Sequence, residues 1–188
     1  MPGRAIAPRP ALAIANAARE ARTLLYLSLT DASGLLHWHL PLSAHTTLLS
    51  GILVPAALAR GSALIPDDEF DQAKMLEWMF WEQYSHEPFI AVRRFRRAFM
   101  NTPDEEIDPD LMAKGRRALG VMEMRLLSRD FIVRDQVTLA DIALVAYTRV
   151  ADEGGFDLDE FLGVRSWVAR VEQEIGIDMD DGRMSPLG

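Results

Sequence analysis

One stretch in the last third of the chain carries the densest pattern of apolar positions and helix-start signals. Thr138 suits the N-cap position, because its hydroxyl can accept a hydrogen bond from the backbone N–H three residues on. Asp141 stands at that third position and can reach back to the N–H of Thr138, which makes a capping box. Val137 and Ile142 are spaced as a hydrophobic staple, and the next four residues are all apolar. The pattern predicts a buried central helix over about residues 138–151, with the other helices packed around it.

Helical spacing of apolar residues predicts four further helices. They are expected over residues 66–85, 88–100, 109–128 and 164–174. Acidic residues follow Pro66 at the start of the first, where they favour the positive end of a helix. Pro88 cannot donate to the helix ladder, so the chain should kink or restart there. Gly115 and Ala118 would let a neighbouring helix approach closely. Five or six helices in this part of the chain predict an all-α helical bundle.

The apolar stripes of two of these helices can be specified. For the first helix the stripe consists of Phe70, Met75, Leu76, Met79, Phe80 and Gln83. Trp78 and Trp81 add apolar surface on other sides, so this helix is expected to bury more than one side. For the last helix the stripe consists of Val164, Trp167, Val168, Val171 and Ile175. One side of the first helix therefore suits the core, and another suits a partner subunit or a ligand cleft.

A cluster of arginines follows Pro88. It consists of Arg93, Arg94, Arg96 and Arg97, which wrap most of the helix circumference. Such a cluster can bind an anion, but the acidic composition favours a solvated face whose charge is balanced by carboxylates.

The first part of the chain has no period that holds for long. Local patterns suggest a helix over residues 11–22 and a strand over residues 24–30. Up to Arg60 the sequence has five arginines and two acids, a net charge of +3, whereas the rest carries −11. The composition thus divides the chain into an irregular or degenerate N-terminal segment, 1–57, and a helical domain, 58–188.

Composition narrows the possible chemistry. The formal net charge of −8 disfavours general nucleic-acid binding, which needs a basic surface. The chain has no cysteine, so disulfides, thiolate metal sites and a cysteine nucleophile are excluded. His37, His39 and His45 have almost no carboxylate nearby, and we expect no metal site. The best apolar run, of about eleven residues, is shorter than the roughly 20 that a membrane span needs, so no membrane partner is expected. An Arg-containing, acid-poor start is also typical of transit peptides, but a compositional bias of the coding DNA is the preferred explanation.

Several segments resemble, in the same order, the C-terminal helical domain of the cytosolic glutathione transferase superfamily, its bacterial members above all. The matching segments are 57–61 (ALARG), 64–66 (LIP), 78–84 (WMFWEQY), 87–88 (EP), 131–142 (FIV to TLADI) and 164–167 (VRSW). The segment that ends in TLADI matches the most specific signature of the family. The resemblance covers about residues 57–188. It implies conjugation of glutathione to small electrophiles, with glutathione as co-substrate, a homodimer and a cytoplasmic location.

The chain departs from this family at its start. The family carries a thioredoxin-like domain of about 80 residues before the bundle, which holds most of the glutathione site, and here that domain is not recognisable. Its Glu/Asp-Ser pair is missing, since Leu49 precedes Ser50, and Tyr26 and Ser28 match a thiolate-stabilising residue only loosely. We expect either a truncated member whose start is misread, or a variant with a reduced first domain. The catalytic residue is unknown, and activity of this chain is doubtful.

Three polar residues are the candidates for substrate binding beside the first bundle helix: Tyr84, His86 and Tyr147. Each has a structural alternative, because buried tyrosines usually satisfy their hydroxyl in the core and His86 adjoins the expected kink. Thr138 and Asp141 are assigned to folding, as the structural capping box. The alternative to a transferase is a non-catalytic helical dimerisation or interaction module.

Overall fold

The computed structural model describes residues 61–176, and in this part of the chain every regular element is helical. The elements are α4 (Glu69–Trp81), the π-helical turn η2 (Glu82–His86), α5 (Glu87–Arg94), the π-helical turn η3 (Phe95–Phe99), the 3-10 turn η4 (Asp104–Glu106), α6 (Pro109–Leu126), α7 (Leu139–Thr148), the 3-10 turns η5 (Ala151–Gly154) and η6 (Leu158–Glu160), and α8 (Leu162–Ile175). The predicted all-α bundle is therefore confirmed for these residues. Several predictions concern residues outside this range. They are the division at residue 57, the helix and strand expected within residues 11–30, and the absence of a metal site at His37, His39 and His45.

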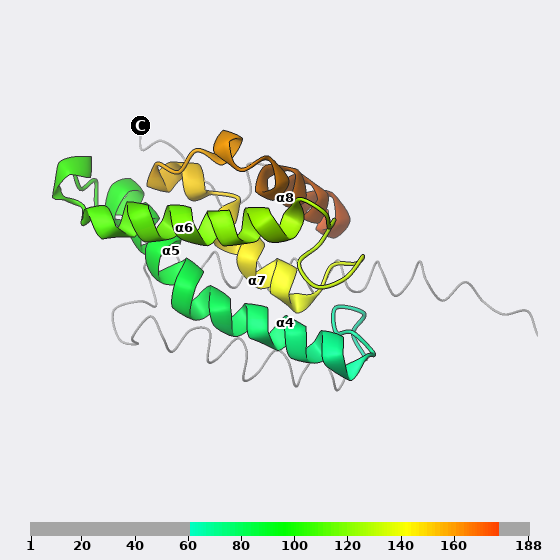
Figure 1. Cartoon of the computed structure of the whole chain (residues 1–188). Helices are drawn as coiled ribbons and strands as arrows, with labels where there is room; N and C mark the ends of the chain where they lie inside the picture. Colours follow the sequence, from blue (N-terminus) through cyan, green and yellow to red (C-terminus); the bar gives the residue numbers. More distant parts are fainter. Residues whose placement is uncertain (1–60, 177–188) are drawn as a thin grey trace, which may run out of the picture.

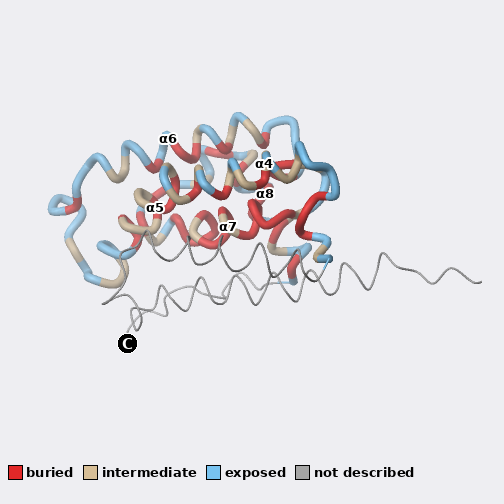
Figure 2. Tube along the Cα trace, turned by 90° about the horizontal axis from the view of Figure 1, so that it is seen from below, coloured by how far each residue is buried: buried red, intermediate tan, exposed pale blue. Residues whose placement is uncertain are grey.

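The helices pack around α7, which contacts α4, α5 and α8 (Figure 1). Helices α4 and α5 form one long, bent rod through η2, and α6 runs back along α5 to reach α8. Buried positions follow α7 along most of its length, whereas the outer side of α6 is exposed (Figure 2). The central position predicted for this helix is thus correct, although α7 ends at Thr148 and a separate 3-10 turn continues to Gly154.

The capping box at the start of α7 is present. The backbone N–H of Thr138 donates to Oδ2 of Asp141 over 2.9 Å, and the side chain of Thr138 in turn meets the backbone of Asp141. The Thr138 hydroxyl also donates to the same Oδ2 over 2.9 Å. Ile142 is buried, and Val137 packs against the core. These local contacts fix where the central helix begins.

The stripe predicted for α4 is wrong in part. Met75 and Met79 are buried, as expected, but Phe70 and Phe80 are 69% and 63% exposed. Successive helical residues are about 100° apart, so Phe80 lies more than a quarter turn from Met79 and outside the packed side. Spacing alone shows which residues share a side of a helix, but the packing partner decides which side is buried.

Helix α8 buries the side that the sequence predicts, and α6 makes the close approach expected at Gly115. On α8 all five residues of the predicted stripe are buried. On α6 the close approach expected at Gly115 comes from Phe156, because a Cβ placed on this glycine would lie 2.5 Å from the Phe156 ring. The first turn of α8 has no side-chain cap of its own. Instead, Glu123 of α6 accepts hydrogen bonds from the backbone N–H groups of Gly163 (3.0 Å) and Val164 (2.9 Å).

Candidate functional site

The predicted binding residues surround the junction of α4 and α5. The junction is the π-helical turn η2, and Pro88 lies in the first turn of α5, so the predicted restart of the helix is confirmed. π-helical turns are rare, and they occur frequently at functional sites. Tyr84 and His86 both belong to η2, and Tyr147 lies on α7, which packs against this turn.

The structure separates the two candidates of the turn. The Tyr84 side chain points to the surface, since the residue is 85% exposed, whereas His86 is 0% exposed. Nε2 of His86 lies 2.9 Å from the hydroxyl oxygen of Thr148, the residue after the half-buried Tyr147. His86 thus faces the interior while Tyr84 faces outward. Substrate binding by Tyr84, His86 and Tyr147 stays a prediction.

Tyr84 shares its surface with two phenylalanines. Phe70, Phe80 and Tyr84 lie within about 80° of one another around the helix axis, and all three are exposed. We call this set the α4 aromatic face. Their aromatic rings carry apolar area that remains in contact with solvent in this structure. Phe80 and Tyr84 are one turn apart, whereas Phe70 lies about 15 Å from Phe80 along the helix.

Beneath this face lies a buried polar cluster that the sequence did not predict. Glu82 and Glu87 are almost fully buried, and Glu82 Oε1 lies 4.0 Å from Nδ1 of His86. Burial raises the pKa of Glu82 to about 8, although the hydrogen bond from Gln83 opposes this. Burial also raises the pKa of Glu87 to about 7 and lowers the pKa of His86 to about 3. All three shifts have the same cause, because burial disfavours the charged form of each group.

A third buried carboxyl group, Asp141, connects three parts of the bundle. Its Oδ1 accepts hydrogen bonds from the backbone N–H of Ile132 and from Nε1 of Trp167, each over 2.9 Å. Its Oδ2 accepts the two bonds from Thr138 described above. Burial raises the pKa of Asp141, while these hydrogen bonds lower it. Asp141 has no exposed surface, so its assignment to folding agrees with its position.

The expectation that the arginine cluster forms a solvated face is wrong for two of its four members. Arg93 and Arg94 are buried, because they reach across to η5 and its neighbours. Nε of Arg93 donates to the backbone oxygen of Gly154 over 2.8 Å, and Nε of Arg94 donates to Glu153 over 2.7 Å. Carboxylates do balance the charge, as predicted.

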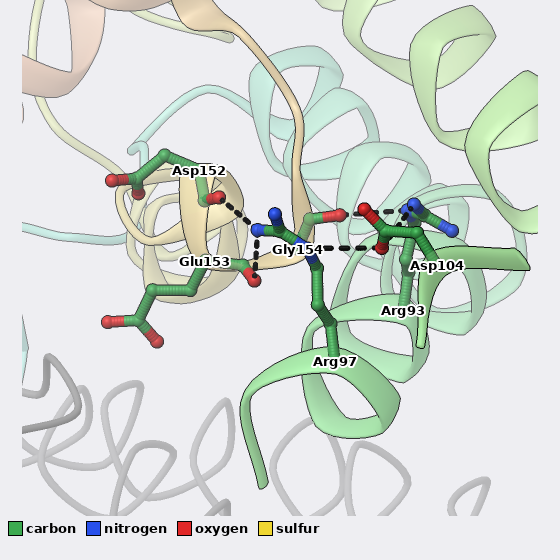
Figure 3. Close-up of polar contacts among 6 residues, drawn as sticks. All are labelled: Arg93, Arg97, Asp104, Asp152, Glu153 and Gly154. Carbon is green, nitrogen blue, oxygen red and sulfur yellow. Dashed lines mark hydrogen bonds and ion pairs between the residues drawn. The ribbon is translucent and has the colours of Figure 1, made fainter. Parts of the chain in front are cut away.

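The arginine contacts with η5 leave little capacity for an added anion. Arg93 and Arg97 both donate to Oδ1 of Asp104 over 3.1 Å (Figure 3). Arg97 Nη1 also donates to the backbone oxygens of Asp152 and Glu153, at 3.5 and 3.3 Å. The two arginines thus hold the carbonyl end of η5 against the end of α5. We assign this group to folding.

The described residues show no other centre of reactive groups. In residues 61–176 no three His, Asp or Glu side chains gather as metal ligands would. Within the same part of the chain, no helix combines the length and apolar character required to cross a membrane.

Comparison with known proteins assigns the bundle to a family. The family model of the glutathione S-transferase C-terminal domain matches residues 75–174, more than half of the chain. The chain therefore belongs to the glutathione S-transferase family. No curated protein sequence matches it.

Solved structures agree with this assignment. A glutathione S-transferase from Pseudomonas fluorescens Pf-5 is 38% identical, with a TM-score of 0.60, and the match covers 72% of this chain and 66% of that protein. A possible glutathione S-transferase from Rhodopseudomonas palustris is 39% identical, with a TM-score of 0.59, over 71% and 66% of the two chains. Ure2p in complex with glutathione is 26% identical, with a TM-score of 0.58, over 69% and 62%. The chain thus spans slightly less than two thirds of the length of these relatives.

Sequence patterns missed the residues that act across the bundle. Thr148 contacts His86 only because α7 packs on η2, and a sequence period carries no signal for that packing. Glu82 lies in the same turn as His86, four residues earlier, but its burial depends on the helices packed around that turn. Asp141 was identified through its local partner Thr138, but its bond to Trp167 joins residues 26 positions apart.

Proposed function

We propose that this chain is a glutathione transferase-like protein that conjugates glutathione to small electrophiles, with its helical domain forming the electrophile-binding wall. The observation that carries the proposal is the α4 aromatic face, whose Tyr84 lies at the helix junction of a domain that belongs to the glutathione S-transferase family. Glutathione is the co-substrate in this proposal, and the protein is a cytoplasmic homodimer. No nucleic acid, membrane or metal takes part in it.

The proposed division of labour follows from the chemistry. The glutathione thiolate attacks an electrophilic atom, so a site needs a group that lowers the pKa of the thiol and an apolar wall that holds the second substrate. Phe80 and Tyr84 supply apolar area that an aromatic or aliphatic electrophile can cover, at about 25 cal/mol for each Å² removed from water. The Tyr84 hydroxyl adds one polar contact at the edge of that wall. Tyr147, on the adjacent α7, is the second polar candidate.

The thiolate-stabilising residue is not assigned to the described part of the chain. The candidates Tyr26, Ser28 and Ser50 lie outside the described residues. Conjugation activity therefore rests on groups that residues 61–176 do not supply, and the wall and the thiol site are separate claims.

A second candidate function is a non-catalytic helical dimerisation or interaction module. The likeness to Ure2p favours it, because that protein was solved as the nitrogen regulation fragment of a yeast prion protein. Ure2p was also solved with S-hexylglutathione, so a regulatory relative can bind a glutathione derivative. In this reading the α4 aromatic face binds a protein partner.

The experiment measures conjugation of glutathione to an activated aryl chloride by the full-length chain. We expect saturable, enzyme-dependent product formation. Phe80→Ala and Tyr84→Ala should raise KM for the aryl chloride and leave KM for glutathione unchanged, because both residues belong to the proposed wall. Met124→Ala is the matched control, since Met124 is also an exposed apolar residue but lies on a different helix, α6.

The outcomes separate the two candidates. Conjugation that Phe80→Ala and Met124→Ala affect equally would remove the aromatic face from the electrophile site. A folded dimer, measured by sedimentation, that shows neither conjugation nor glutathione binding would leave the interaction module.

A further inference from the structure

The buried cluster beneath the α4 aromatic face has a defined hydrogen-bond direction. The hydroxyl of Thr148 lies 2.7 Å from the backbone oxygen of Leu144, and a carbonyl oxygen can only accept, so the hydroxyl hydrogen is used there. Nε2 of His86, 2.9 Å from the same hydroxyl oxygen, must therefore carry a hydrogen and donate it. The neutral ring then bears its lone pair on Nδ1.

That lone pair has no donor in the structure. Nδ1 of His86 is fully buried and has no hydrogen-bond partner. A buried acceptor without a partner is costly, so such groups are rare in folded proteins. Oε1 of Glu82 lies 4.0 Å from it.

The second oxygen of Glu82 is already engaged. Oε2 accepts a hydrogen bond from the side-chain amide of Gln83 over 3.0 Å. If Glu82 is a neutral carboxylic acid, its proton belongs on Oε1, the oxygen that faces His86. A side-chain rotation that shortens the 4.0 Å separation by about 1 Å would complete an O–H···N hydrogen bond.

We propose that Glu82 is held in the folded protein as a neutral carboxylic acid whose Oε1 proton is directed at Nδ1 of His86. Glu82, His86 and Thr148 then form a buried, proton-dependent latch between η2 and α7. When Glu82 ionises, its carboxylate faces the Nδ1 lone pair and the latch has no hydrogen to share. Tyr84 lies in the same turn, so the latch also fixes the backbone that carries this exposed side chain.

Within residues 61–176, the structure pairs no Lys or Arg with Glu82. Helices α4, α5, α6 and α7 pack against η2. On α5 the neighbouring group is Glu87, whose like charge further raises the pKa of Glu82. On α7, Arg149 donates to Glu172 over 2.8 Å, and on α4, Lys74 pairs with Glu77.

The charged groups of α6 are also directed elsewhere. Arg125 donates to the backbone oxygens of Ile132 and Val133, and Glu123 caps α8. Arg116 pairs with Glu160, and Lys114 pairs with Asp110. The inward residues of α6 near the turn are apolar. A neutral Glu82 is consistent with these surroundings.

The latch predicts a specific pH range. The folded pKa of Glu82, about 8, exceeds its ordinary value of 4.5, so the folded protein binds the proton more tightly and stability falls as pH rises between these values. For His86 the pKa in the folded protein, about 3, lies below its ordinary value of 6.5. Its contribution therefore has the opposite sign, so that stability rises with pH up to about pH 6.5. Glu87 acts like Glu82 but only up to about pH 7. The range from pH 6.5 to 8 therefore isolates Glu82 best.

The first experiment compares urea unfolding of the full-length wild type and Glu82→Gln between pH 6.5 and 8. The amide keeps the shape of the neutral acid, can donate to Nδ1 and can accept from Gln83, but it does not ionise. We expect the folding equilibrium constant of the wild type, relative to the variant, to fall about 16-fold in total between pH 6.5 and 8, most steeply at the lower end. Glu77→Gln, on an exposed side of α4, is the matched control and should keep the wild-type slope. Equal slopes for the wild type and Glu82→Gln would overturn the proposal, as would a Glu82→Gln chain that fails to fold at pH 6.5.

The second measurement reads the His86 ring of the wild type directly. The ¹⁵N signals of the His86 ring are recorded in the labelled wild type and assigned by their loss in His86→Gln. We expect the neutral tautomer with hydrogen on Nε2 from pH 6 to 8. A ring with hydrogen on Nδ1, or an imidazolium ring paired with a Glu82 carboxylate, would overturn the proposal.

Discussion

Substitution of Asp141 tests the contacts that hold the bundle together. Asp141→Ala removes the acceptor of the backbone N–H groups of Ile132 and Thr138 and of the Trp167 indole N–H. Each buried donor left without a partner costs about 1–3 kcal/mol. The Thr138 hydroxyl also loses its acceptor, so four hydrogen bonds are lost in all. Their loss would cost more, but the variant also no longer buries a carboxylate, whose burial raises the pKa of Asp141. We therefore expect a net loss of about 3–5 kcal/mol.

A graded series checks this estimate. Asp141→Asn keeps one carbonyl oxygen for Ile132 and Trp167 but presents an NH₂ group towards Thr138, so we expect a loss of about 1–2 kcal/mol. Asp159→Ala is the control, because this carboxylate is exposed and pairs with Arg165 on the surface, and its change should stay within about 0.5 kcal/mol.

The assay is urea unfolding followed by tryptophan fluorescence and by far-UV circular dichroism on the same samples. A free energy of unfolding of about 5–15 kcal/mol is usual for a domain, so the alanine variant should be strongly destabilised or unfolded. The reasoning would be refuted if Asp141→Ala and Asp159→Ala unfolded at the same urea concentration. It would also be refuted if the asparagine variant were less stable than the alanine variant.

Three other substitutions have expected outcomes that unfolding measurements check. Gly115→Ala should cost about 1–2 kcal/mol, because the new methyl group would overlap the buried Phe156 ring. Gly120→Ala has open space around it and should be neutral or stabilising by up to about 1 kcal/mol. Equal effects of the two substitutions would contradict this prediction. Glu123→Ala should cost about 1–2 kcal/mol, because the first turn of α8 loses its cap, and near-neutrality would show that water replaces the carboxylate. Arg93→Met should cost about 2–3 kcal/mol, because the carbonyl end of η5 loses a buried donor, and a change below about 0.5 kcal/mol would remove this contact from the account.

Local features of the fold could be predicted from the sequence because their causes are local. Thr138 and Asp141 are three residues apart, and the spacing alone indicates a capping box. Pro88 marks the restart of the helix because its ring and missing N–H act on the preceding turn. The apolar stripe of α8 was predicted because one continuous side of it is buried.

Features that depend on packing between helices could not be predicted. The sequence period grouped Phe80 with Met79, but only contact with α7 determines that Met79 is buried and Phe80 exposed. The buried state of Glu82 and Arg93 is contrary to their usual preference for the surface. Arg93 reaches a partner 61 residues later, Gly154, and Glu82 is buried by the helices that pack against its turn. The direction of the His86 ring likewise depends on Thr148, 62 residues later.

The central claim is that this chain binds glutathione and presents an apolar wall to the second substrate. Calorimetric titration of the purified full-length chain with glutathione and then with S-hexylglutathione tests both parts directly. The account predicts saturable binding of glutathione, and tighter binding of the hexyl derivative that Phe80→Ala reduces and Met124→Ala does not. Absence of binding of either ligand down to about millimolar affinity, by a folded and helical sample, would contradict the transferase proposal and leave the interaction module.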